Sequence, residues 1–154
     1  MDSVGKPCVV RVLREPLAAD LPMPRYMTDH AAGADLCAAV AEPVTLEPGA
    51  FAMISTGIRL EIPHGFEGQV RPRSGLAARH GITMLNSPGT IDADYRGVVH
   101  VIVINHGGGP FTISHGDRIA QLVIAPVVRA LFEPCDDLAG SQRSDGGFGH
   151  TGVR

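Results

Sequence analysis

Short apolar runs separated by turn-forming residues dominate the hydropathy pattern of this chain. Residues 58–62 read Ile-Arg-Leu-Glu-Ile, a strict alternation that places the apolar side chains on one face of a β-strand. Residues 98–104 and 119–128 are almost continuously apolar, which predicts strands buried on both faces. Our hypothesis is that such a strand buries its second face against another subunit. Shorter strands are predicted at 8–13, 65–71 and 111–114.

Proline and glycine recur between these runs at intervals that suit short strands joined by turns. This spacing predicts an all-β fold, either a sandwich or a barrel. One short helix is predicted with Ser74 as its N-cap and Gly81 as its C-terminal stop. Beyond Leu138 the sequence turns to glycine, serine and charged residues. We therefore expect a β domain over 1–138 and a flexible arm over 139–154.

Composition narrows the class of protein. The 154 residues suit one domain, and 44% of them are hydrophobic. A net charge of −3 argues against a disordered chain and against a general nucleic-acid binder, which needs a basic face. The apolar runs are too short to cross a bilayer, and no signal peptide is visible. Three cysteines without metal-type spacing indicate reduced thiols in a cytoplasmic protein.

The segment 86–97 carries the densest chemistry of the chain. It reads Asn-Ser-Pro-Gly-Thr-Ile-Asp-Ala-Asp-Tyr-Arg-Gly and looks like the tip of a hairpin between two apolar runs. Polar groups on such a tip can face a ligand with fixed geometry. Asp92 or Asp94 could serve as a general base for water. Tyr95 could lie flat against a sugar or a base, or it could simply pack internally.

The segment 71–75, Arg-Pro-Arg-Ser-Gly, offers two guanidinium groups and a hydroxyl at the start of the expected helix. That combination suits an anion such as phosphate, although a solvated loop with a capped helix would read the same way. Asp35 stands among small residues, where it is either a turn residue or a carboxylate that orders water around a metal ion. Gln121 lies in a run that reads as core, so its amide needs partners. Asp117 and Arg118 read as a turn residue and a surface ion pair.

The C-terminal segment 143–152 combines an arginine, a phenylalanine and flexible glycines. A tail this polar is usually disordered, but an isolated aromatic ring with no core to join also fits a closing lid. The histidines show no metal-ligand spacing. Each of these segments is a weak signal when it is considered alone.

Five segments in this order and spacing closely resemble the ordered motifs of the trimeric deoxyuridine triphosphatase (dUTPase) family. They are Ala-Gly-Ala-Asp-Leu at 32–36, Pro-Arg-Ser-Gly-Leu-Ala at 72–77, the segment 86–97, Gly-Asp-Arg-Ile-Ala-Gln-Leu at 116–122 and Arg-Ser-Asp-Gly-Gly-Phe-Gly at 143–149. The resemblance covers residues from about 25 to 152. It implies a jelly-roll homotrimer with shared sites that hydrolyses dUTP to dUMP and pyrophosphate with Mg²⁺. That activity limits uracil incorporation into DNA and supplies dUMP for thymidylate synthesis.

The resemblance also implies a role for each matched residue. Asp92 would orient the attacking water, and Tyr95 would stack beneath the deoxyribose and leave no room for a 2′-hydroxyl. Asp35 would bind waters around Mg²⁺. The remaining substrate-binding residues are Asn86, Thr90 and Ile91 for the uracil, Arg73, Ser74, Gly75 and Gln121 for the phosphates, and Arg143, Phe148 and Gly149 from the arm.

Two positions depart from the commonest family pattern. Ser144 stands where a glycine often follows the arm arginine, and Asp94 stands where many members have glycine. Two alternatives stay open on the sequence. A related dCTP deaminase would need a glutamate beside the base, whereas the glutamates lie outside the matched motifs. A non-catalytic trimeric nucleotide-binding protein would have lost a reacting group, and none of the matched groups is missing.

Overall fold

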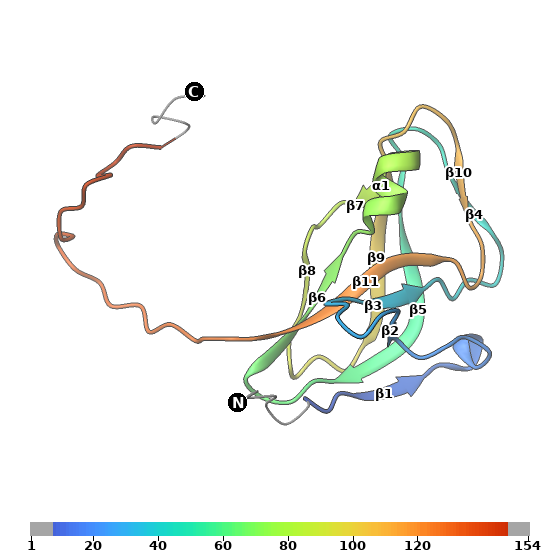
Figure 1. The fold of residues 1–154 in the computed structure, drawn as a ribbon, viewed down its shortest axis with the longest axis horizontal. Helices are drawn as coiled ribbons and strands as arrows, with labels where there is room; N and C mark the ends of the chain where they lie inside the picture. Colours follow the sequence, from blue (N-terminus) through green and yellow to red (C-terminus); the bar gives the residue numbers. More distant parts are fainter. Residues whose placement is uncertain (1–7, 148–154) are drawn as a thin grey trace.

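Two antiparallel sheets face each other across the main apolar core in the computed structural model, which describes residues 8–147 (Figure 1). The first sheet has the order β1 (Arg11–Arg14), β5 (Phe51–Glu61), β9 (Val98–Asn105) and β7 (Ile82–Met84). The second has the order β2 (Arg25–Tyr26), β3 (Ala34–Cys37), β11 (Arg118–Pro126), β6 (Phe66–Arg71) and β8 (Gly89–Ile91). A small third sheet pairs β10 (Phe111–Ile113) with β4 (Val44–Leu46). This is the jelly-roll arrangement that the resemblance implies.

The core forms where the inward-facing residues of the two sheets meet. Val101 of β9 and Leu36 of β3 are 0% and 1% exposed, and Val70 and Leu122 lie opposite each other in the second sheet. The predicted alternation at 58–62 is confirmed, because Ile58, Leu60 and Ile62 are buried while Arg59 and Glu61 are not. β-Branched apolar residues such as Ile and Val are favoured in strands because they pack well on a pleated, half-buried surface. Core packing therefore fixes the sheet from which the polar loops project.

The outer face of the first sheet is open in the single chain. The prediction that β9 is buried on both faces is wrong for this chain alone, because His100 is exposed and Ile102 is only half-buried. On the neighbouring strand β5, Phe51 and Met53 are 60% and 66% exposed. Met53 lies directly opposite Ile102 in the register, so these side chains form one apolar strip. Nothing within the described residues covers it.

The predicted hairpin between β8 and β9 is also wrong. β8 pairs with β6 at the edge of the second sheet, whereas β9 lies in the first sheet between β5 and β7. Both hydrogen-bonding edges of β9 are therefore occupied, and β8 finds its partner elsewhere. The segment 92–97 crosses from one sheet to the other instead of closing a hairpin.

The helix prediction is confirmed with a shift of one residue. α1 spans Ser74–His80, and its N-cap is Arg73 with an extended backbone rather than Ser74. Gly81 ends the helix at a φ of 67°, in the left-handed region that a glycine adopts without strain. A short 3-10 turn, η1 (Pro16–Ala18), packs elsewhere against β5.

The chain leaves the body of the domain after β11 and runs outward as an extended segment (Figure 1). Within residues 127–147, Val128, Leu131 and Phe132 are 93%, 85% and 91% exposed. No helix among the described residues is long and apolar enough to span a membrane. Large apolar side chains in this outward segment are therefore left uncovered by the rest of the described chain.

Candidate active site

A carboxylate held by two guanidinium groups forms the first part of the site. Asp35 lies on β3 with its side chain only 14% exposed. One oxygen forms an ion pair with Arg73 Nε at 3.2 Å, and the other accepts a hydrogen bond from Arg118 Nη1 at 3.1 Å. Arg73 Nη1 also donates to the backbone oxygen of Arg118 at 3.0 Å. The three residues form a closed cluster with one negative and two positive charges, which favours an anion as the next ligand.

Strand register places Gln121 beside this cluster. Gln121 of β11 lies opposite Asp35 of β3 on one side and opposite Arg71 of β6 on the other. Its Nε2 donates to the Pro72 carbonyl oxygen at 3.0 Å, which satisfies the requirement of its amide for a partner. A β-carbon on Gly33 would lie 2.2 Å from Gln121 Oε1, so only glycine leaves room for this side chain. The amide is thus fixed against the loop that leads into α1.

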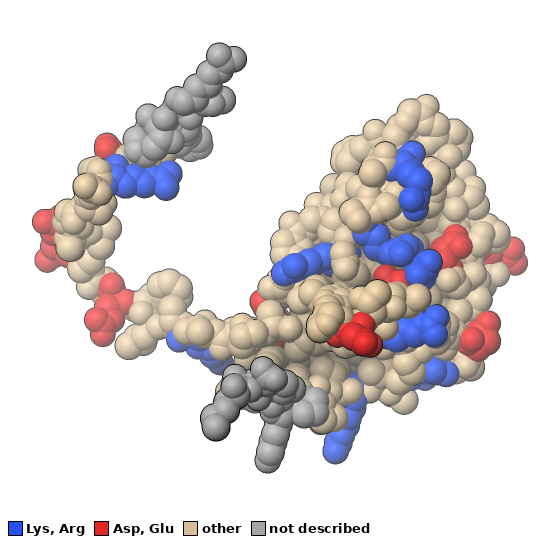
Figure 2. Space-filling model, viewed as in Figure 1, with Lys and Arg blue, Asp and Glu red and all other residues tan. Residues whose placement is uncertain are grey.

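The start of α1 adds further polar groups. Ser74 is exposed, and the first backbone N–H groups of a helix have no partner inside it. Arg79, one turn further on, lies over Gly75, where a β-carbon would be 2.9 Å from its Nη2. Arginine side chains gather over the middle of this face, near β3 and β11 (Figure 2). Arg73, Ser74, Gly75, Gln121 and Asp35 are therefore brought together.

A tight turn carries the second group of predicted site residues. The backbone N–H of Tyr95 donates to the Asp92 carbonyl oxygen at 3.1 Å, which closes the turn 92–95. The Asp92 side chain is exposed at its start. Tyr95 folds back so that its hydroxyl donates to the Val98 carbonyl oxygen at 3.1 Å. The turn therefore holds a free carboxylate and an aromatic ring in a fixed relation.

Arginine side chains brace this turn from behind. Arg96 Nη1 donates to the carbonyl oxygens of Ala93 and Tyr95 at 2.7 and 3.0 Å. Arg59 Nη1 donates to the Arg96 carbonyl oxygen at 3.1 Å, and Arg59 is itself paired with Glu15. Guanidinium groups that bind several carbonyl oxygens at once limit the motion of a loop.

The remaining predicted nucleoside contacts lie along the entry to the turn. Asn86 and Thr90 are exposed, and Thr90 lies opposite Gln69 at the sheet edge. Ile91 is 7% exposed, so its side chain belongs to the core and only its backbone can meet a ligand. No hydrogen bond or ion pair among the described residues joins these side chains to the Asp35 cluster. The two groups lie on the same sheet, with β6 and β11 between β8 and β3.

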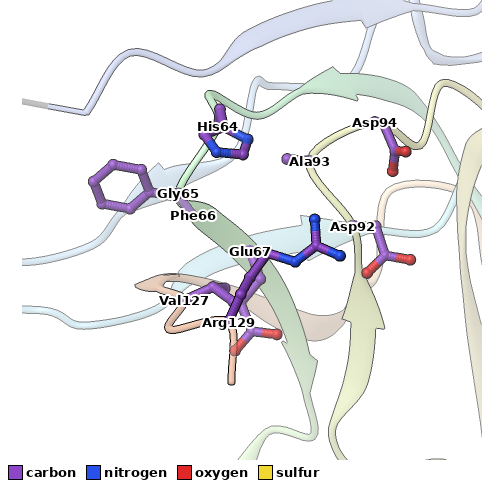
Figure 3. A pocket seen from close by; sticks show the side chains of 9 residues that line it. All are labelled: His64, Gly65, Phe66, Glu67, Asp92, Ala93, Asp94, Val127 and Arg129. Carbon is purple, nitrogen blue, oxygen red and sulfur yellow. The ribbon is translucent and has the colours of Figure 1, made fainter. Parts of the chain in front are cut away.

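A cavity of about 510 Å³ adjoins the turn (Figure 3). Asp92 and Asp94 lie at one wall, Glu67 at another, and the Arg129 side chain extends between them in this view. Among the predicted site residues that the structure describes, only Asp92 lines it. The cavity therefore does not enclose the phosphate-side cluster.

The described residues provide no direct cage for a metal ion. They contain no group of three or more histidine, cysteine, aspartate or glutamate side chains placed to hold one. Each Asp35 oxygen has one guanidinium partner and retains a second acceptor position. The donor set therefore fits Mg²⁺ that arrives with a polyphosphate and keeps its waters, which Asp35 could accept as hydrogen-bond donors.

The arm is described only in part. Arg143 is exposed and donates from Nε to the Gly146 carbonyl oxygen at 2.8 Å. Ser144 has a φ of 46°, the left-handed conformation for which glycine is suited, and this matches the departure noted in the sequence. Phe148 and Gly149 lie outside the described residues.

Sequence reasoning missed several contributors. Asp117 is a turn residue as interpreted, since its Oδ2 accepts a hydrogen bond from the Ser114 backbone N–H at 2.7 Å, and Arg118 does form an ion pair, but its partner Asp35 was not predicted. Gly33 and Arg79 were also missed, although both lie in or beside the matched motifs. The only available signal was their position next to residues already chosen.

Shifted pKa values occur outside the turn. Burial raises the pKa of the Cys37 thiol, and the charge of nearby Asp35 adds to the effect. A hydrogen bond from His115 lowers the pKa of Asp20. This contact links the segment after η1 to the loop before β11. Neither group contacts the predicted site residues through a side-chain hydrogen bond.

Fold and site together define a class: an all-β jelly-roll protein with a positively charged, anion-accepting cluster and a braced turn that presents a free carboxylate. Comparison with known proteins narrows this class. The family model described as dUTPase matches residues 19–152. The deoxyuridine 5′-triphosphate nucleotidohydrolase of Anaeromyxobacter sp. (strain Fw109-5) is 63% identical over 132 residues, which cover 86% of this chain and 88% of that protein. The chain therefore belongs to the dUTPase family.

Solved structures agree with this assignment. The dUTPase of Staphylococcus bacteriophage 80alpha, solved with dUPNHPP, superposes with a TM-score of 0.84 at 28% identity and covers 94% of this chain and 99% of its own. A variant dUTPase from phage phi11 of S. aureus, in which coordination of a structural Mg(II) ion was described, has a TM-score of 0.74 at 26% identity. Its match covers 84% of this chain and 97% of that chain.

Proposed function

We propose that this chain hydrolyses dUTP to dUMP and pyrophosphate. The observation that carries the proposal is the Asp35–Arg73–Arg118 cluster beside Gln121 and Ser74, in a chain that belongs to the dUTPase family. Two guanidinium groups against one carboxylate leave a positive charge on a half-buried surface. A polyphosphate is the anion that such a surface and a neighbouring helix start accommodate best.

We assign to Asp92 the role of orienting the attacking water and accepting its proton. Its carboxylate is exposed and is bound by no other side chain among the described residues, so it can accept a proton from water. The water oxygen forms a bond to the α-phosphorus while the bond from that phosphorus to the α,β-bridging oxygen breaks. Pyrophosphate leaves with the bonding electron pair, and the water proton passes to Asp92.

Phosphate binding falls to the other group. Arg73, Ser74, the Gly75 backbone and Gln121 neutralise and orient the phosphate oxygens, with Arg143 added from the arm. Phosphoryl transfer depends mainly on positioning and charge neutralisation, which these groups supply. Mg²⁺ bound to the triphosphate would neutralise further charge, with Asp35 accepting hydrogen bonds from its waters.

The nucleoside is assigned to the segment 86–95. The Asn86 side chain and the backbone at Thr90 and Ile91 would read the uracil edge, which differs from the cytosine edge by exchanged donors and acceptors. Tyr95 would lie beneath the sugar, and Phe148 with Gly149 would cover the base. Because the side chain of Ile91 is buried, its contribution is limited to its N–H and C=O groups.

We further propose that the working unit is a homotrimer with shared sites. Two apolar surfaces without partners on the single chain support this: the strip of β5 and β9 that contains Phe51 and Met53, and the outward segment that contains Leu131 and Phe132. Contiguous exposed apolar surface typically marks an interface. In this proposal residues 1–138 form the β domain and residues 139–154 complete the site of a neighbouring subunit.

The cellular role follows from the reaction. Removal of dUTP limits uracil incorporation into DNA, and the dUMP formed is the precursor for thymidylate. We place the protein in the cytoplasm, in keeping with three free cysteines, Cys8, Cys37 and Cys135.

A pyrophosphate-release assay tests the proposal. We expect rapid release from dUTP in the presence of Mg²⁺, release that is slower by at least about a hundredfold from UTP, dCTP and dTTP, and a strong loss when Mg²⁺ is chelated. Equal rates for all four nucleotides would contradict the assigned site. Stoichiometric ammonia release from dCTP would show that the chain is a deaminase instead.

A further inference from the structure

We infer that Gly97 sets the discrimination between deoxyribose and ribose by holding the Tyr95 ring in place. The inference rests on the proposed function, in which Tyr95 supports the sugar. Gly97 touches no substrate in this account. It acts through Tyr95 and is therefore a positioning residue.

The ring of Tyr95 occupies the space that any side chain at position 97 would need. A β-carbon on Gly97 would lie 2.2 Å from Tyr95 Oη, 2.4 Å from Cζ and 2.8 Å from Cε2. Contacts this short do not occur between unbonded atoms, so the ring and a side chain at 97 exclude each other. Only a glycine allows the ring to fold flat against the chain and its hydroxyl to reach the Val98 carbonyl oxygen.

The backbone at this point cannot easily retreat to relieve such a clash. Arg59 binds the Arg96 carbonyl oxygen, and Arg96 binds the carbonyl oxygens of Ala93 and Tyr95. Val98 is the first residue of β9. The next residue, Val99, is 2% exposed and packs in the core. The Tyr95 side chain, by contrast, is at the surface, because the residue is 46% exposed. The side chain is therefore the part that moves.

This asymmetry separates an effect on specificity from an effect on folding. Gly97 is not among the glycines with a positive φ, so its backbone suits alanine. In Gly97→Ala the ring swings toward solvent, the hydrogen bond to Val98 is lost, and the floor beneath the sugar opens. A ribose 2′-hydroxyl then finds room that the native ring denies it. Phosphate binding, which belongs to Arg73 and Gln121, is untouched.

The test compares four proteins: wild type, Gly97→Ala, Tyr95→Ala and the double variant. The matched control is Gly108→Ala, an exposed glycine whose added β-carbon would meet nothing within 4 Å. The measurements are kcat/KM for dUTP and UTP, binding of dUMP and UMP by calorimetry, inhibition by pyrophosphate, and the melting temperature. The binding data give the sugar preference even for a variant with little turnover.

We expect Gly97→Ala to lower the ratio of dUTP to UTP kcat/KM by about tenfold or more, with the dUMP to UMP binding ratio falling in parallel. Pyrophosphate inhibition and the melting temperature should match those of the Gly108→Ala control. In the Tyr95→Ala background, adding Gly97→Ala should change the ratio by less than about twofold.

Two results would overturn the inference: an unchanged sugar preference in Gly97→Ala, or an equal loss of preference with and without the tyrosine. Wild-type protein that fails to hydrolyse dUTP would contradict the proposed function instead, so the two failures are distinguishable.

Discussion

At the scale of single residues, Asp35 shows how contacts determine what a carboxylate can do. Both of its oxygens are paired with guanidinium groups, and its side chain is only 14% exposed. A carboxylate so engaged holds the two arginine side chains in place. Asp92 carries no such partners within residues 8–147. The same residue type therefore serves positioning at one place and proton transfer at the other.

Asp92→Asn tests this division of roles. The amide has the same shape but cannot accept the water proton, so we expect kcat to fall by about two to four orders of magnitude. Binding of dUMP and the melting temperature should remain close to wild type, because the Asp92 backbone still closes the turn with Tyr95. The measurement is steady-state pyrophosphate release together with calorimetric binding. A variant with wild-type kcat would remove Asp92 from the role of base.

Sequence reasoning at this scale succeeded where a residue stood out from its neighbours. Gln121 is an amide in an apolar run, so a hydrogen-bond partner was predicted for it. Its side chain donates to the Pro72 carbonyl oxygen. The ion-pair partner of Arg118 was not predicted, because Asp35 lies 83 positions away in the sequence. Gly33 and Gly97 could not be ranked above other glycines, since their importance lies in what occupies the missing side-chain space.

At the scale of elements, the longer strands were predictable and strand pairing was not. β5, β9 and β11 follow from alternation or from continuous apolar runs, and β6 was predicted as a short strand. The two-residue strand β2 and the three-residue strands β4, β7 and β8 carry too few residues for a period to show. The hairpin predicted across 86–97 failed because adjacency in sequence favours pairing, whereas both edges of β9 are already used by β5 and β7.

Removal of the arm tests its role as a separate element. We expect a chain truncated after Gly140 to retain its melting temperature and oligomeric mass, because β11 ends at Pro126 and the core lies within the strands. Turnover of dUTP should fall by about a hundredfold, since Arg143 and Phe148 would no longer reach the substrate. Light scattering, thermal melting and pyrophosphate release are the measurements. Loss of assembly on truncation would show that the arm is structural.

At the scale of the whole molecule, the single chain leaves its chemistry divided. The turn 92–95 follows β8 and no side-chain link among the described residues joins it to the Asp35 cluster, while apolar surface remains open on β5 and along the outward segment to residue 147. Association of three copies would cover that surface and set the turn of one subunit against the phosphate-binding group of another. The hypothesis that β9 buries its second face against another subunit has the same physical basis, because His100 is exposed and Ile102 is only half-buried.

The most direct test of the central claim is hydrolysis of dUTP in water enriched with oxygen-18, followed by mass spectrometry of both products. If water oriented by Asp92 attacks the α-phosphorus, the label appears in the phosphate of dUMP and is absent from pyrophosphate. Label in pyrophosphate would show attack at the β-phosphorus, and the absence of dUMP would show that the chain does not perform this reaction. Either result would contradict the account.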